Sequence, residues 1–73
     1  MPDLYTFLMP FNSRVRVYIC DDTGYLLISG VLENIDYEKY DLCPVKEAEI
    51  NHLNGNLTVY IEVPDERRYY END

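Results

Sequence analysis

The stretch that decides the expected fold is residues 15–32, VRVYICDDTGYLLISGVL. Two runs of β-branched and aliphatic residues flank an acidic turn that contains Gly24. In the first run, residues 14–20, apolar residues alternate with polar or aromatic ones, which is the period of a half-buried strand. In the turn, short acidic side chains bond the local backbone and glycine can take a positive φ. The stretch therefore predicts a β-hairpin.

The second run, residues 25–34, is apolar at nearly every position. Such a run predicts a strand that is covered on both sides. Gly30 lies in its middle, and glycine inside a strand marks a bulge or a sharp bend. A bent strand is what a small barrel needs in order to close on itself.

The residues before this hairpin predict one or two turns of helix. Asp3 is a candidate N-cap, and Pro10 should end the helix near Leu8 or Met9, because the residue before a proline avoids helical geometry. The expected helix packs on the barrel as a lid by its apolar side. The residues at near-helical spacing are Leu4, Tyr5, Leu8 and Met9.

The residues after the hairpin are less regular. Residues 35–41 are polar and aromatic without a clear period, so they form either a loop or the start of a third strand. Residues 42–50 are a weaker strand candidate, and Pro44 favours a strand start or an edge.

The clearest strand in the sequence comes last. Asn54-Gly55 is a strong hairpin signal, and beyond it residues 57–63 alternate between apolar and polar until Pro64. We therefore expect one small β-barrel domain over residues 1–63. Residues 64–73 are expected to form a charged, flexible tail, which is either solvated or offers a small contact patch of Arg67, Arg68, Tyr69 and Tyr70.

Length and charge limit the classes of function. A chain of 73 residues is at most one domain with a thin core. Its net charge of −8 argues against non-specific binding to nucleic acid, which depends on Lys and Arg neutralising phosphates. The charge permits a basic protein partner or mimicry of nucleic acid, and it also serves ordinary solubility. No apolar run approaches the ~20 residues that span a membrane, so no membrane partner is expected.

Cysteine and histidine content predicts no metal, no cofactor and no enzyme. A structural zinc needs about four ligands, and Cys20, Cys43 and His52 are too few. We expect no leader sequence before the domain and therefore a reducing cytoplasm and two thiols, with a disulfide as the alternative. His52 has no nucleophile spaced with it. The acidic turn before Gly24 lacks the full ligand series of a calcium loop.

Several motifs together resemble the Sm-like proteins. The pattern of Val15-x-Val17, Gly24, Gly30-Val31-Leu32 and Asp36 resembles the first signature of that family. Residues 52–61, HLNGNLTVYI, are similar in spacing to the second signature, and residues 7–15 are similar to the family's helix-to-strand entry. The resemblance implies an all-β fold, a small SH3-like or Sm-like barrel of about five strands with a short N-terminal helix. It also implies a ring of copies and binding of single-stranded RNA.

The base-binding positions depart from the family pattern. Tyr40 stands where the family has asparagine, and Asn54 stands where it has the arginine of an arginine-glycine pair. In the RNA hypothesis, tyrosine rings stack on bases and Asn54 contacts a base edge. In the alternative, the tyrosines cover one end of the barrel and Asn54-Gly55 is only a tight turn. The candidate RNA-binding residues are Asp36, Tyr37, Tyr40, Asn54 and Gly55.

Eight tyrosines favour a contact surface, because tyrosine is enriched at interfaces, and partial burial with the hydroxyl in water is the alternative. In the expected assembly, residues 50–53 pair with residues 59–63 of another copy, which supplies backbone hydrogen bonds and closes exposed edges. A ring forms if the head-to-tail rotation closes. The candidate subunit-interface residues are Tyr18, Ile50, Leu53, Val59, Tyr60 and Ile61.

The sequence thus predicts a non-enzymatic assembly or binding module in the cytoplasm. Two partners remain open at this stage. The first is single-stranded RNA bound by a ring of copies. The second is a basic protein surface, bound by an acidic module of mobile-element or phage origin that binds no nucleic acid.

Overall fold

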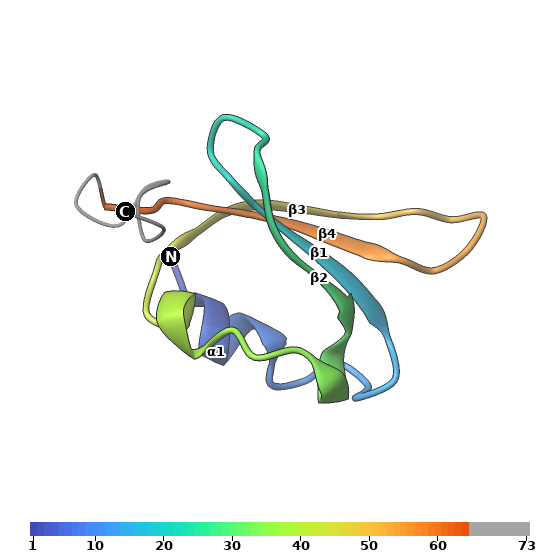
Figure 1. Cartoon of the computed structure of the whole chain (residues 1–73). Coiled ribbons are helices and arrows are strands. Elements are labelled where there is room, and N and C mark those ends of the chain that lie inside the picture. The colour runs from blue at the N-terminus through green and yellow to red at the C-terminus, as the bar shows by residue number, and fades with distance from the viewer. Residues whose placement is uncertain (65–73) are drawn as a thin grey trace.

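The computed structural model describes residues 1–64, which form one short helix and one sheet (Figure 1). The predicted tail, residues 64–73, lies outside this range except for Pro64, and so does its contact patch of Arg67, Arg68, Tyr69 and Tyr70. Two 3-10 turns, Leu32–Asn34 and Glu38–Tyr40, lie between the second and third strands. The elements are α1 (Leu4–Leu8), β1 (Arg16–Asp21), β2 (Leu26–Val31), β3 (Val45–Ile50) and β4 (Leu57–Ile61).

The described residues build a single four-stranded sheet in the order β2-β1-β4-β3. The two outer pairs, β1–β2 and β3–β4, are antiparallel hairpins, and they join through a parallel pairing of β1 with β4. Ile19 of β1 lies opposite Val59 of β4. The small, β-rich character of the fold is therefore confirmed. Residues 35–41, for which loop and strand were both open, contain a 3-10 turn.

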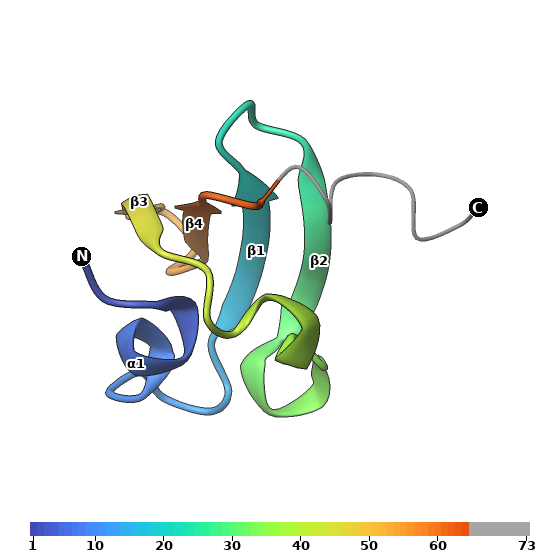
Figure 2. The same cartoon turned by 90° about the vertical axis from the view of Figure 1, so that its left-hand side faces the viewer.

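One face of the sheet is covered and the other is open. Helix α1 and the segment that links β2 to β3 lie on the same side of the sheet (Figures 1 and 2). Alternate residues of β1 and β4 point to this side and are almost fully buried, as are Leu4 and Leu8 of the helix. The sheet residues of this core are Val17, Ile19, Val45, Leu57, Val59 and Ile61.

Helix α1 has the cap and the end that its sequence predicts. The Asp3 carboxylate accepts a hydrogen bond from the Thr6 N–H at 2.8 Å, which satisfies one of the free amides of the first turn. This bond lowers the pKa of Asp3. The Leu4 N–H donates to the Cys43 carbonyl at 2.9 Å and so ties the helix to the segment before β3.

The β1–β2 turn forms around a buried carboxylate. Asp21 has no exposed surface, and its Oδ1 accepts hydrogen bonds from the Thr23 N–H (2.9 Å), the Thr23 hydroxyl (2.7 Å) and the Tyr25 N–H (3.0 Å). Gly24 has a φ of 94°, which side-chain-bearing residues rarely adopt. The predicted acidic turn is confirmed.

Strand β2 differs from the prediction. No residue of β2 is fully buried, because β2 is an edge strand, so the expectation of cover on both sides is wrong. The register shift of the hairpin lies between Ile19 and Cys20 rather than at Gly30. Gly30 is required for another reason. Its φ is 149°, and a Cβ there would come within 2.7 Å of the Ile35 Cγ2.

The β3–β4 hairpin is confirmed, with a wider loop than a two-residue turn. The Asn51 N–H donates to the Asn56 carbonyl at 2.9 Å, and the Gly55 N–H donates to the Asn51 carbonyl at 2.7 Å. Gly55 has a φ of 75°. In β4, buried and half-buried residues alternate as the sequence predicts.

Candidate functional site

The structure divides the candidate RNA-binding residues between two distant places. Asp36, Tyr37 and Tyr40 belong to the segment that links β2 to β3, close to α1. Asn54 and Gly55 lie at the tip of the β3–β4 hairpin, at the opposite end of the molecule (Figure 1). The five residues therefore do not form one site within the chain.

Several of these residues take part in the fold itself, in the core or in the hydrogen bonds of their own turns. Tyr40 is 7% exposed and belongs to the core, which leaves little of its ring for a base to stack upon. The Asp36 carboxylate accepts a hydrogen bond from the Glu38 N–H at 3.1 Å. The Asn54 side-chain oxygen accepts one from the Asn56 N–H at 3.0 Å. Each of these polar side chains shapes its own turn.

Tyr37 lies beside a shallow hollow of about 230 Å³ that includes Tyr5, Asp36, Glu38 and Asp41. Burial raises the pKa of Tyr37, and Tyr5 and Asp41 add to the effect. The three carboxylates around one half-buried ring make this hollow an unfavourable place for a phosphate.

The candidate interface residues also separate into groups. Val59 and Ile61 are fully buried in the core, and β4 is bonded to β1 on one side and β3 on the other. Pairing of residues 59–63 with another copy would thus require one of these ladders to open. Ile50 and Leu53, by contrast, are 51% and 97% exposed. The unpaired edges of the described sheet are β2 and β3.

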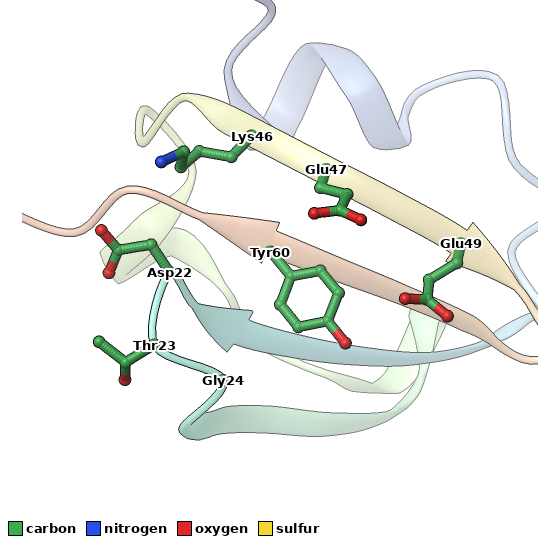
Figure 3. A pocket seen from close by; sticks show the side chains of 7 residues that line it. All are labelled: Asp22, Thr23, Gly24, Lys46, Glu47, Glu49 and Tyr60. Carbon is green, nitrogen blue, oxygen red and sulfur yellow. The ribbon is translucent and has the colours of Figure 1, made fainter.

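The open face of the sheet carries a polar hollow of about 350 Å³ (Figure 3). Tyr60 of β4 lies at its centre, and Glu47 of β3 is its neighbour in the ladder. The β1–β2 turn borders the hollow on the other side, so three separate parts of the chain form it. The lining residues are Asp22, Thr23, Gly24, Lys46, Glu47, Glu49 and Tyr60.

The hollow is electrostatically negative. Burial raises the pKa of the Tyr60 hydroxyl, and the nearby groups Glu49, Cys20 and Glu47 raise it further. The one ammonium group of the hollow, Lys46, lies 3.8 Å from the Glu62 carboxylate. Carboxylates thus outnumber cations around an accessible tyrosine, and a cationic group is the natural complement.

The sequence pattern indicated Tyr60 as a contact residue but did not indicate Asp22, Glu47 and Glu49 as its neighbours. The alternation of Glu47 and Glu49 places them on one side of β3, and this signal was available. The sequence did not predict the register of β3 and β4, which sets Glu47 beside Tyr60. It also did not predict that the β1–β2 turn lies across from them.

The cysteines of the described residues are buried. Burial raises the pKa of the Cys20 thiol, and Asp21 adds to this, so the thiol stays protonated at neutral pH. No disulfide joins Cys20 to Cys43, and both are buried. Within residues 1–64, no three His, Cys, Asp or Glu side chains gather as a metal-binding group. No helix in that range is long and apolar enough to cross a membrane.

Comparisons of the chain with protein-family models, with curated proteins and with solved structures found no match.

Proposed function

We propose that the protein is an acidic interaction module, and that the open face of its sheet binds a basic surface of a partner protein. The observation that carries the proposal is the hollow in which Tyr60 lies among Glu47, Glu49 and Asp22 (Figure 3). This arrangement joins an aromatic contact surface to several hydrogen-bond acceptors of one charge. Arginine and lysine side chains match both features.

The charge of the whole chain supports the same partner. A net charge of −8 attracts a cationic protein over distances of about a screening length and so speeds its encounter with the open face. The tyrosine ring then supplies contact area at a small cost in side-chain entropy.

RNA is the less favoured partner. Its phosphates would meet the same negative potential, and the residues expected to hold a base lie at two ends of the molecule. Asn54 already accepts a hydrogen bond inside its own loop.

The test compares two double variants with equal charge. Glu47→Gln/Glu49→Gln removes two carboxylates from the hollow, and Glu33→Gln/Glu38→Gln removes two from the segment between β2 and β3. We expect the first variant to weaken binding of a hexa-arginine peptide by about tenfold, since each of two exposed ion pairs contributes up to about 1 kcal/mol. The second should weaken it far less. Isothermal titration calorimetry measures both.

Equal losses in the two variants would show that only net charge matters and would contradict the proposal. The same protein should also be titrated with short U-rich and A-rich RNA by fluorescence anisotropy. Saturable RNA binding that is lost in Tyr37→Ala would favour the RNA hypothesis instead.

A closed barrel of about five strands, a place among the Sm-like proteins and a ring of copies stay predictions. Because β4 has strands on both sides, a ring would have to be built through the outer edges of β2 and β3. A light-scattering mass equal to one chain would count against the ring.

A further inference from the structure

The outer edge of β3 is available for pairing along most of its length. Strand β3 comes last in the sheet order. Within residues 1–64, its outer side meets the chain only at its start, where Asp3 bridges to Pro44 and the Val45 N–H donates to the Pro2 carbonyl at 2.9 Å. Residues 46–50 are all exposed. An extended segment of this chain thus already pairs with the start of this edge, while the backbone of residues 46–50 has no partner strand on that side among the described residues.

The hydrogen bonds between β3 and β4 show which backbone groups of β3 point outward. In an antiparallel ladder, successive residues turn their N–H and C=O groups alternately toward and away from the partner strand. The Asn51 N–H donates to the Asn56 carbonyl at the hairpin loop. The backbone N–H and C=O groups of Glu49 and Glu47, two and four residues earlier, therefore also point toward β4. The backbone groups of Ala48 and Ile50 therefore point outward.

The two sides of β3 differ sharply in chemistry. Glu47 and Glu49 lie opposite Tyr60 and Thr58 and belong to the open, negative face. Ala48 and Ile50 lie opposite Val59 and Leu57, which are buried on the covered side.

Along the covered side of β3 lies an apolar groove of about 400 Å³. Two aromatic rings line it, those of Phe7 and Phe11, with centroids 5.4 Å apart. Ala48, Ile50 and Leu57 line it as well, and so do the polar residues Glu49 and His52. A side chain directed to this side from an added strand would meet this groove.

We propose that the β3 edge takes up an extended segment of a partner protein in which basic and apolar residues alternate. Residues opposite Glu47 and Glu49 would be arginine or lysine, and those opposite Ala48 and Ile50 would be aliphatic, because neighbours across a ladder share a face. Backbone bonds to Ala48 and Ile50 provide affinity, and the alternating side chains provide specificity. This inference rests on the proposed function and names the form of the basic partner.

Charge disfavours a second copy as the occupant. Suppose that two copies of β3 pair antiparallel with their open faces on the same side of the joined sheet. In such registers, Glu47 lies opposite Glu49 of the other copy, or a glutamate lies opposite the same glutamate of the other copy. Like charges directly opposite one another in a ladder are destabilising. A cationic segment turns the same positions into attractive pairs.

The test uses two synthetic peptides that match the six-residue length of β3. One alternates arginine and valine, and the other has the same composition with all arginines before all valines. The alternating peptide should bind at least about tenfold more tightly, a difference of about 1.4 kcal/mol. Amide hydrogen exchange of Ala48 and Ile50 should slow by at least about tenfold in its presence. Ser29 and Val31, the outward residues on β2, should not change.

Ala48→Pro removes the outward N–H of Ala48, and Ser29→Pro is the matched change at the other edge strand. Proline is tolerated on an edge strand where the N–H faces solvent, and thermal unfolding checks that both variants fold. We expect Ala48→Pro to abolish the preference for the alternating peptide and Ser29→Pro to retain it.

Three results would overturn the inference or the function beneath it. Equal binding of the two peptides, with no exchange protection at Ala48 or Ile50, would reject edge pairing. If Glu47→Gln/Glu49→Gln still weakened the binding of both peptides, the proposed role of the acidic face would stand. Protection at Ser29 and Val31 would move the site to β2. No binding of either peptide at low salt would reject both proposals.

Discussion

The two hairpins of this sheet use similar turn chemistry and have very different surroundings. In the β1–β2 turn, a side-chain oxygen of fully buried Asp21 accepts three hydrogen bonds. In the β3–β4 loop, the side-chain oxygens of Asn51 and Asn54 each accept one, and the tip residue Leu53 is 97% exposed. The first turn is thus part of the folded interior, while the second is a surface loop.

The strands repeat this contrast. The inner strands β1 and β4 carry most of the buried sheet residues, and the last five residues of β3 are exposed. The buried core of the sheet and the exposed residues of the β3 edge therefore lie mostly on different strands. A strand that contributes little to the core can hold its charged side chains for a partner at little cost to the fold.

The largest expected difference concerns two isoleucines. Ile19→Ala removes a fully buried side chain at the centre of β1 and should lower the free energy of unfolding by about 3–4 kcal/mol, through lost burial and the cavity left behind. Ile50→Ala, at a side chain that is 51% exposed, should cost less than about 1 kcal/mol. Urea unfolding followed by circular dichroism measures both. Similar losses would show that β3 is as much a part of the core as β1.

Local patterns were sufficient to predict several individual elements. The alternation of residues 57–63, the Asp3 cap and the acidic turn before Gly24 all depend on near neighbours, and all three are confirmed. Each follows from the geometry of one strand, helix end or turn.

The pairing of distant strands could not be predicted in this way. The apolar run of β2 predicted a strand with cover on both sides. The structure instead places β4 next to β1 and leaves β2 at the edge. The hairpin at Asn54-Gly55 sets Glu47 beside Tyr60, but only the long-range pairing of β1 with β4 brings the β1–β2 turn to the same hollow. That pairing is information that no local pattern holds.

The next largest difference concerns the two turns. Asp21→Ala removes a buried acceptor and leaves the amides of Thr23 and Tyr25 without it, which should cost about 2–3 kcal/mol. Asn54→Ala removes one exposed bond, to the Asn56 N–H, and should cost about 0.5 kcal/mol or less. The difference in thermal midpoint between the variants, measured by calorimetry, checks the contrast. Equal midpoints would mean that Asp21 does not anchor its turn.

The smallest predicted difference separates the glycines. Gly55→Ala places a side chain at a φ of 75° in open space, so only backbone strain of about 1 kcal/mol is expected. Gly30→Ala combines a φ of 149° with an approach of 2.7 Å to the Ile35 Cγ2, and should cost about 2 kcal/mol. Denaturant unfolding of each variant gives the two values.

A double-variant cycle can separate the two causes at Gly30. Ile35→Ala removes the Cγ2 that the new Cβ would meet, so Gly30→Ala should cost about 1 kcal/mol less in that background than in the native chain. If the cost is unchanged, backbone strain alone explains it, and the close packing of Ile35 over β2 contributes nothing to the requirement for glycine. If the cost falls, the close approach of Ile35 contributes to the requirement for glycine at the end of the first hairpin. The exposed β3–β4 loop has no equivalent at Gly55, where nothing lies within 4 Å of an added Cβ.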